Sequence, residues 1–311
     1  MDTFFSHGKL LLTGEYVVLD GALSLATPTE AGQSLIIEAF DEPLIIWKSV
    51  DDTGKTWYEH EFAFDDIDTK YNTRGDELTA RLLDIFYAAK QLNPKFLTGK
   101  TGYQVATLLD FPRDWGLGTS STLINNIANW AQVDAYKLLE LTFGGSGYDI
   151  ACAQNFSALS YKIEADNSKT VTTVDFDPEF KEALYFVYLN KKQNSRDGIA
   201  QYRKNSTDNA TAVAEISAIT TQIIACTTLE TFNSLIDKHE AIIAKLIQQT
   251  PVKKLHFNDF HGSIKSLGAW GGDFVLATSS TDPTDYFKAK GFETVIPYNE
   301  MVVEDDILSF L

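Results

Sequence analysis

The stretch Pro112-Arg113-Asp114-Trp115-Gly116-Leu117-Gly118-Thr119-Ser120-Ser121 is a glycine-rich turn that runs directly into an amphipathic segment. In that segment Leu123, Ile124, Ile127 and Trp130 recur at helical spacing, so we expect a helix to begin where the turn ends. Glycines let the backbone approach an anion closely, and the N–H groups and positive dipole end of a helix start favour phosphate. We expect the hydroxyls of Thr119, Ser120 and Ser121 to cap the first turn. The stretch therefore predicts a phosphate-binding turn, with an ordinary capped helix start as an equal alternative.

Length and composition indicate a soluble globular protein. The 311 residues are enough for two domains, and 44% hydrophobic with 12% aromatic residues exclude a mainly disordered chain. The formal net charge of −17 disfavours nucleic acid and anionic membranes as partners, because both need an excess of positive surface. The two cysteines, Cys152 and Cys226, are too few for a disulfide framework or a thiolate metal site, and we expect both to be buried in helices. The N-terminus lacks a basic region followed by an apolar core, and no run of about 18 apolar residues occurs, so we expect a cytoplasmic protein.

Missing motifs exclude several enzyme classes. No Gly-x4-Gly-Lys-(Ser/Thr) loop is present, which argues against a P-loop kinase, and no Gly-x-Gly-x-x-Gly follows a strand, which argues against a dinucleotide-binding fold. The serines of the glycine-rich stretches do not lie in a Gly-x-Ser-x-Gly elbow. His60 and His239 are each followed by glutamate but not by a second histidine four residues on. Because His239 lies on the apolar stripe of a predicted helix, we expect a packed histidine there.

The N-terminal stretch Ser6-His7-Gly8-Lys9-Leu10-Leu11-Leu12-Thr13-Gly14-Glu15-Tyr16-Val17-Val18-Leu19 contains a second glycine-containing turn. Residues 4–12 and 16–19 are rich in Phe, Leu and Val, so we expect two strands joined by a tight turn at Thr13-Gly14-Glu15. Lys9 is the residue of interest. A solvated strand lysine is the ordinary interpretation, and the apolar neighbours and the adjacent Gly8 favour a functional one.

Two more glycine-rich stretches come later in the chain. Gly144-Gly145-Ser146-Gly147-Tyr148-Asp149 leads into a predicted helix and places Asp149 in its first turn, where the dipole stabilises a carboxylate. Asp149 therefore either supports the helix start or takes part in chemistry. Ser266-Leu267-Gly268-Ala269-Trp270-Gly271-Gly272-Asp273 leads into a predicted strand at residues 274–277. The polar segment from Lys191 to Asp197, which contains Arg196, is either a solvated loop or a substrate-facing one.

The remaining elements follow from hydrophobic spacing and turn residues. Residues 34–40, 44–48 and 57–64 predict a strand meander, and Asp76 is placed to cap a helix that ends before Pro94. Further elements are predicted as strands at residues 103–109, 158–163, 184–189 and 293–296, and as helices at residues 208–226, 229–247 and 285–290.

Four of these stretches, taken in order along the chain, resemble the motifs of the GHMP kinase superfamily, which includes galactokinase, homoserine kinase, mevalonate kinase and phosphomevalonate kinase. The N-terminal stretch is similar to Gly-Lys-x-x-Leu-x-Gly-Glu-(Tyr/His)-x-Val-Leu, and its Glu15-Tyr16 form looks most like the mevalonate and phosphomevalonate branch. The turn at Gly116 resembles Pro-x3-Gly-Leu-Gly-(Ser/Thr)-Ser. The other two resemble Ser-Gly-x-Asp-x-Ala and Gly-Ala-Gly-Gly-Gly-(Asp/Gly), although Trp270 replaces a glycine and His7 stands where proline is usual.

The resemblance implies an α/β (α+β) two-domain GHMP kinase fold. The N-terminal half, residues 1–178, would be like the second domain of ribosomal protein S5 and would bind the nucleotide. The C-terminal half, residues 179–311, would be ferredoxin-like. The implied activity is transfer of the γ-phosphoryl group of Mg-ATP to an alcohol or phosphate acceptor, most like mevalonate or phosphomevalonate.

The resemblance also implies roles for individual residues. Asp149 would accept or orient the acceptor hydroxyl, and Lys9 would lower its pKa and neutralise developing charge. Ser120 would be a magnesium ligand, with Glu140 as the nearest candidate for a second one. The residues expected to bind ATP are Gly116, Leu117, Gly118, Thr119, Ser120, Ser121, Gly268, Gly271 and Gly272. The residues expected to lie on the substrate side are Glu15, Tyr16, Ser146 and Arg196.

Several alternatives stay open. Trp115 and Trp270 are bulky residues in segments that usually stay small, and they could either stack on a nucleotide or block its pocket. The alternative function is a catalytically weak GHMP-fold protein that binds a metabolite and acts as a regulator or subunit. The acceptor cannot be identified from the sequence, since specificity depends on cleft-lining side chains. The oligomeric state, with a homodimer as one alternative, is also open.

Overall fold

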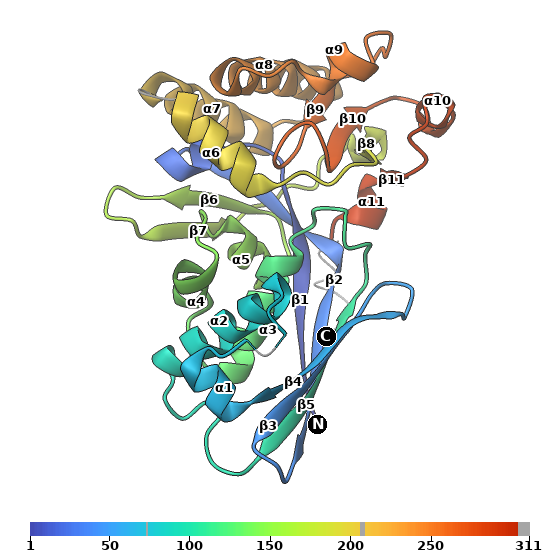
Figure 1. Ribbon diagram of the computed structural model, residues 1–311. Coiled ribbons are helices and arrows are strands. Elements are labelled where there is room, and N and C mark those ends of the chain that lie inside the picture. The colour runs from blue at the N-terminus through green and yellow to red at the C-terminus, as the bar shows by residue number, and fades with distance from the viewer. Residues whose placement is uncertain (73, 206–208, 304–311) are drawn as a thin grey trace, which may run out of the picture. The chain divides into compact units, whose positions relative to one another are not determined.

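The computed structural model describes residues 1–72, 74–205 and 209–303 (Figure 1). Its internal contacts divide the chain into two compact units that are interleaved in sequence. Unit 1 contains Met1–Gly8, Ala31–Arg113 and Gly118–Gln154, and unit 2 contains Lys9–Glu30, Asp114–Leu117 and the described residues after Gln154. The predicted domain boundary between residues 178 and 179 stays a prediction.

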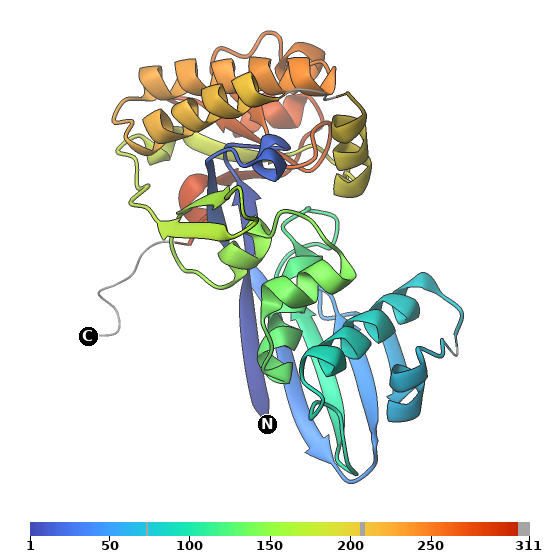
Figure 2. The same cartoon turned by 90° about the vertical axis from the view of Figure 1, so that its left-hand side faces the viewer.

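Unit 1 is a sheet with helices packed against it (Figures 1 and 2). Its strands are β3 (Leu44–Val50), β4 (Thr56–Ala63), β5 (Gly102–Leu109) and the parts of β1 (Asp2–Leu11) and β2 (Ser24–Phe40) that belong to this unit. Its helices are α1 (Phe64–Thr69), α2 (Glu77–Leu92), α3 (Thr119–Ala131), α4 (Ala135–Thr142) and α5 (Tyr148–Ala153). The strand order β4-β3-β5-β2 shows that the predicted meander is wrong, because β5 lies between β2 and β3 and pairs with β3 in parallel.

The core of unit 1 is built from aromatic side chains of the sheet and the helices. Phe86 of α2 is fully buried and makes T-shaped contacts with Trp47, Phe62 and Trp130, with ring centroids 5.4–6.5 Å apart. Helix α2 begins where the sequence predicts, because the Asp76 carboxylate accepts the N–H of Thr79 at 2.8 Å. Burial of one face of α2 and α3 therefore fixes these helices on the sheet.

Unit 2 contains an antiparallel sheet of the order β11-β8-β10-β9. Counted along the chain, this order is fourth, first, third, second, which is the ferredoxin-like arrangement that the resemblance implies. The strands are β8 (Leu184–Tyr188), β9 (Ile264–Ser266), β10 (Phe274–Thr278) and β11 (Val295–Pro297). The helices are α6 (Ser195–Asn205), α7 (Ala210–Ile224), α8 (Leu229–Ile247), α9 (Val252–His256), α10 (Thr284–Ala289) and α11 (Tyr298–Met301), and α7 packs along α8 (Figure 2).

Unit 2 also holds the pairing of Ser24–Ala26 of β2 with β6 (Leu159–Ile163), which continues to β7 (Lys169–Thr173). Two short 3-10 helices, η1 (Val17–Asp20) and η2 (Lys181–Ala183), complete this unit. Helix η1 corrects the prediction of a strand at residues 16–19. The backbone turns sharply at Tyr16 instead of continuing in extended form, so the apolar run Val17–Val18 is buried in a helical turn.

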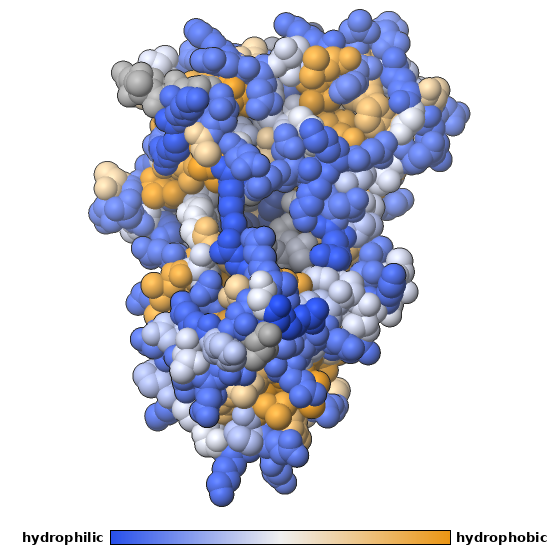
Figure 3. All heavy atoms as spheres, viewed as in Figure 1, coloured by the Kyte–Doolittle hydropathy of each residue, from blue (hydrophilic) through white to orange (hydrophobic). Residues whose placement is uncertain are grey.

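The surface carries mostly hydrophilic side chains on the face in Figure 3, consistent with the net charge of −17. Among the described residues, no helix combines the length and apolar character needed to cross a membrane. Of the two cysteines, Cys152 is buried in α5 as predicted. Cys226 is half-buried after the end of α7, so the prediction of a helical, buried position is wrong there.

Candidate active site

Lys9 lies against the glycine-rich turn that precedes α3. The Nζ atom of Lys9 donates a hydrogen bond to the carbonyl of Gly116 at 2.8 Å, and its backbone N–H donates to the carbonyl of Leu117 at 2.9 Å. Lys9, Gly116 and Leu117 all belong to unit 2. The side chain of this strand lysine is therefore directed at the predicted phosphate-binding turn, and the first and second motifs meet here.

Asp273 brings the fourth motif, residues 266–273, to the same place. An added Cβ at Gly116, whose φ is +72°, would lie 2.4 Å from the Cγ atom of Asp273, so the carboxylate packs directly on the glycine backbone. The Oδ1 atom of Asp273 accepts the N–H of Gln193 at 3.0 Å. Burial raises the pKa of Asp273, while the Gln193 N–H and the charges of Lys9 and Lys192 oppose that increase.

These residues border a small pocket within unit 2. Its lining consists of Lys9, Leu10, Leu11, Trp115, Gly116, Leu267, Gly268, Asp273 and Phe274. Three of the four motifs thus contribute to one pocket that combines a lysine, a carboxylate and two glycines with positive φ. Asp273 has no role in the sequence prediction, and the signal that could have found it is its place directly after Gly271-Gly272.

Helix α3 begins at Thr119 as predicted, but its cap differs. Gly118 occupies the N-cap with φ +94° and no side chain caps the first-turn N–H groups in the described structure. The predicted capping hydroxyl of Ser121 instead donates to the Gly118 carbonyl at 2.8 Å. The capping prediction for Thr119, Ser120 and Ser121 is therefore wrong. The N–H groups at this helix start keep their capacity to bind an anion.

Asp149 and the metal candidates lie in unit 1. Asp149 stands in the first turn of α5, which begins after Gly147 with φ +89°, and Ser146 beside it is buried. Tyr136 of α4 lies near Asp149. Burial raises the pKa of Tyr136 to about 12, and the nearby Cys152 and Asp149 act in the same direction. Ser120 is exposed at the start of α3 and Glu140 is exposed on α4.

The side chains of Ser120 and Glu140 have the ligand chemistry of a magnesium ion that arrives with a nucleotide. Residues 1–72, 74–205 and 209–303 contain no cluster of three or more His, Cys, Asp or Glu side chains that could hold a metal ion alone. Mg²⁺ is usually held by one or two carboxylates together with substrate phosphates and water. A hydroxyl from Ser120 and a carboxylate from Glu140 are ligands of this class. Their role as ligands stays a prediction.

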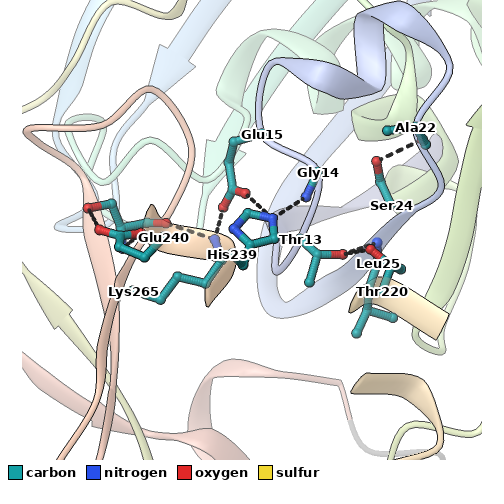
Figure 4. A network of polar contacts seen from close by, with 11 residues as sticks. Thr13, Gly14, Glu15, Ala22, Ser24, Leu25, Thr220, His239, Glu240 and Lys265 are labelled. Carbon is teal, nitrogen blue, oxygen red and sulfur yellow. Dashed lines mark hydrogen bonds and ion pairs between the residues drawn. The ribbon is translucent and has the colours of Figure 1, made fainter. Parts of the chain in front are cut away.

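Glu15 and Tyr16 have an environment that the sequence did not indicate. Glu15 is 1% exposed and forms an ion pair with Lys265, which is 0% exposed (Figure 4). The imidazole Nε2 of His239 accepts the N–H of Gly14 at 2.9 Å and lies 3.4 Å from Glu15 Oε2. The hydroxyl of Tyr16 donates to the carbonyl of Ala269 at 2.8 Å. His239 is packed as predicted, but it belongs to a buried polar network.

Burial dominates the titration of this network. It raises the pKa of Glu15 against the opposing charge of Lys265, and it raises the pKa of Glu240 to about 8. Burial and the Lys265 charge hold the pKa of His239 well below its usual value, so its imidazole is neutral. Sequence reasoning missed Lys265 because nothing in a three-residue strand such as β9 distinguishes a buried lysine from an exposed one.

The two tryptophans have different positions. Trp270 is 1% exposed, with φ +57°, so its side chain is packed inside unit 2. Trp115 is half-buried, borders the pocket and makes a T-shaped contact with Phe274 at 5.4 Å. Of the two, only Trp115 borders the space beside Lys9. Arg196 is exposed in the first turn of α6, which shortens the predicted loop.

The chain is similar in fold to several solved structures. The chain matches Methanococcus jannaschii mevalonate kinase with a TM-score of 0.71 and 20% identity, covering 94% of this chain and 96% of that one. It matches Streptococcus pneumoniae phosphomevalonate kinase in complex with phosphomevalonate and AMPPNP with a TM-score of 0.69 and 16% identity, covering 93% and 96%. The chain therefore has the GHMP kinase fold. Lactococcus lactis galactokinase complexed with galactose also matches, with a TM-score of 0.65, 12% identity and coverage of 93% and 88%.

The GHMP kinase fold is thus present at very low sequence identity. No family model and no curated protein sequence matches the chain. The predicted fold class is confirmed, whereas the roles of the predicted site residues stay predictions. Of these residues, the structure brings Lys9, Gly116 and Gly268 together around one pocket.

Proposed function

We propose that this protein is a kinase that transfers the γ-phosphoryl group of ATP to a small alcohol or phosphorylated alcohol of the mevalonate class. The observation that supports this most directly is the meeting of Lys9 with Gly116 and Gly268 at one pocket, in a chain with the GHMP kinase fold. The solved neighbours include a mevalonate kinase, a phosphomevalonate kinase in complex with phosphomevalonate and AMPPNP, and a galactokinase complexed with galactose.

The proposed reaction needs positioning and charge stabilisation more than covalent chemistry. The N–H groups at the start of α3, together with the backbone of Gly116–Gly118, bind the phosphates of ATP. Ser120 and Glu140 would hold magnesium, which when bound would neutralise phosphate charge. The ammonium group of Lys9 stabilises the charge that develops on the transferred phosphoryl group.

Asp149 orients the acceptor hydroxyl or accepts its proton as the oxygen attacks the γ-phosphorus. The bond between the γ-phosphorus and the bridging oxygen breaks, and ADP leaves. Lys9 favours the deprotonated acceptor oxygen electrostatically. These roles follow from the motif resemblance. Asp149 stands in the first turn of α5, where the helix dipole favours its ionised form.

The decisive experiment measures ADP release from Mg-ATP with mevalonate and with 5-phosphomevalonate. The native chain is compared with Asp149→Asn and with Asp41→Asn, a control at an exposed turn of the same unit. We expect turnover with one acceptor, a fall of about 100-fold or more in Asp149→Asn, and no change in the control. Failure of the native protein to bind Mg-ATP in a calorimetric titration would refute the proposal. Binding of Mg-ATP without turnover of either acceptor would instead favour the catalytically weak alternative or another alcohol.

A further inference from the structure

The turn at Tyr16 is strained, and a buried network surrounds it. Tyr16 has φ +64° and ψ −51°, and the N–H of Val17 donates to the carbonyl of Glu15 at 2.8 Å. These values describe a γ-turn of the rare, strained type. A residue in such a conformation persists only where its surroundings over-determine it, and such residues cluster at functional sites.

Contacts on both sides of this turn hold it in place. Before the turn, Gly14 donates to His239 of α8, and Glu15 is paired with Lys265 of β9 (Figure 4). At the turn, the Tyr16 ring stacks on Tyr202 of α6 with a centroid distance of 5.5 Å. We call this set of contacts, which also includes the bond from Tyr16 to Ala269, the Glu15 clamp. All of its residues belong to unit 2.

The Glu15 clamp also fixes the turn between β9 and β10. Lys265 Nζ donates to the carbonyl of Ser266 at 2.9 Å, and Glu240 accepts both the N–H and the hydroxyl of Ser266, at 3.1 Å and 2.8 Å. Three residues further on, the carbonyl of Ala269 accepts the Tyr16 hydroxyl. The Gly268–Gly272 turn is therefore attached to the turn at Tyr16 in two places. One is Lys265 in β9, the strand before it, and the other is Ala269, its second residue. This is the turn that borders the pocket beside Lys9.

Burial separates Glu15 and Tyr16 from any acceptor. Glu15 is 1% exposed, and Tyr16 is 6% exposed with its hydroxyl already donating to a carbonyl. A carboxylate paired with a buried lysine would lose that pairing if it turned toward a ligand, which is costly. Substrate contact, the expectation from the sequence, therefore has less support than a role inside the protein.

We propose that Tyr16 and Lys265 are positioning residues, in which Tyr16 holds the Gly268–Gly272 turn, Lys265 holds Glu15, and neither contacts the acceptor. The expected effect on ATP binding rests on the proposed function, since the turn that they hold is one of the predicted ATP-binding segments. The attachment of the turn by Tyr16 and Lys265 does not depend on that function. Loosening the turn affects ATP binding, and the acceptor site is unaffected.

The first test removes one hydroxyl. Tyr16→Phe is compared with Tyr298→Phe, because Tyr298 is also buried in unit 2 and its hydroxyl donates to the carbonyl of Phe176 at 3.3 Å, away from this turn. Hydrogen exchange of the nucleotide-free protein is followed by mass spectrometry in peptides that span residues 266–273. We expect exchange there to be about fivefold faster in Tyr16→Phe, the effect of one lost buried hydrogen bond, and unchanged in Tyr298→Phe.

Kinetics separate positioning from substrate contact. For Tyr16→Phe we expect the KM for Mg-ATP to rise about fivefold while the KM for the acceptor stays unchanged. A raised acceptor KM with unchanged exchange at residues 266–273 would overturn the proposal, because it would show direct contact of Tyr16 with the acceptor. The exchange experiment needs neither nucleotide nor acceptor. A protein with no kinase activity would therefore refute the proposed function, and the exchange result would still decide the clamp.

The second test removes the lysine. Lys265→Met is compared with Lys253→Met, a lysine of the same unit that donates to the carbonyl of Gly262 at 2.7 Å. We expect faster exchange in peptides spanning residues 13–17 and 266–273 for Lys265→Met, and no change there for Lys253→Met. If Lys265→Met does not fold, the double variant Glu15→Gln with Lys265→Met leaves no buried charge and is measured in its place. Unchanged exchange in both segments would overturn the role of Lys265.

Discussion

Replacing Lys265 by methionine is predicted to destabilise the protein by an amount that grows with pH. Lys265 and Glu15 are both buried and form an ion pair, and the charge of Lys265 opposes the increase that burial causes in the pKa of Glu15. Without Lys265, the buried carboxyl group of Glu15 must stay charged and unpaired or bind a proton. Protonation at pH 7, from a reference pKa of 4.5, costs about 3.5 kcal/mol at about 1.4 kcal/mol per pH unit.

Proton binding to Glu15 sets the direction of this pH dependence. In Lys265→Met the pKa of Glu15 is raised further in the folded state, so the folded variant holds one proton more at this site than its unfolded form. Stability relative to the native protein therefore falls as pH rises above the native pKa of Glu15. We expect a loss of at most about 1 kcal/mol at pH 5 that grows to at most about 3.5 kcal/mol at pH 7, because the native pKa of Glu15 is raised as well. Glu240, whose pKa burial raises to about 8, stays protonated across this window in both proteins.

Urea unfolding followed by circular dichroism at pH 5, 6 and 7 measures this loss. The matched control is the double variant Glu15→Gln with Lys265→Met, which lacks both members of the ion pair. Its loss relative to the native protein is expected not to grow over the three pH values. An equal loss for Lys265→Met at pH 5 and pH 7 would refute the argument, because it would show that Glu15 does not bind a proton when its partner is absent.

Three further predictions concern the pocket, the core and the clamp. Gly116→Ala is expected to lower the free energy of unfolding in urea by about 2 kcal/mol. The variant has a residue other than glycine at positive φ, and its new Cβ collides with the Asp273 carboxylate and displaces it from the Gln193 N–H. Adding Asp273→Ala should remove that collision and recover part of the loss. Phe86→Ala is expected to cost about 3–5 kcal/mol, since it empties a fully buried site, and a loss below about 1 kcal/mol would contradict the packing of α2. Glu240→Gln removes a carboxyl group whose folded pKa is raised to about 8, so its stability relative to the native protein should rise between pH 5 and 8, by at most about 1.4 kcal/mol per pH unit, and a flat difference would contradict that pKa.

The sequence predicted those elements whose cause is local. Helix α2 begins after Asp76 and helix α8 follows its apolar stripe, because capping and helical periodicity act within a few residues. The order of β3, β5 and β2 could not be predicted, since pairing depends on contacts between distant segments. The strand predicted at residues 16–19 failed for a similar reason. The turn at Tyr16 is imposed by Lys265 and Ala269, which lie about 250 residues later in the chain.

The candidate site also contains some features with a local cause, which the sequence showed, and others that depend on distant residues. The glycine-rich stretches could be recognised because the backbone there has conformations that only glycine adopts cheaply, with φ +94° at Gly14 and +72° at Gly116. In both places an added Cβ would also collide, with the Oγ of Ser24 at 2.0 Å and with the Cγ of Asp273 at 2.4 Å. Such requirements leave a pattern in the sequence even where identity to the solved neighbours is only 12–20%.

Buried polar partners leave no such pattern. Lys265 could be replaced by an apolar residue, if Glu15 changed with it, at little cost in stability, because a buried ion pair is often no more stable than well-packed apolar side chains. Stability alone therefore does not explain a charged pair at this position. An ion pair does fix the orientation of its side chains. Lys265 orients Glu15, and the position of Glu15 in turn fixes the backbone turn at Tyr16. We infer that the glycines of this site give the pocket beside Lys9 its space, whereas the buried pair determines where that space lies, and only the glycines can be recognised from the sequence.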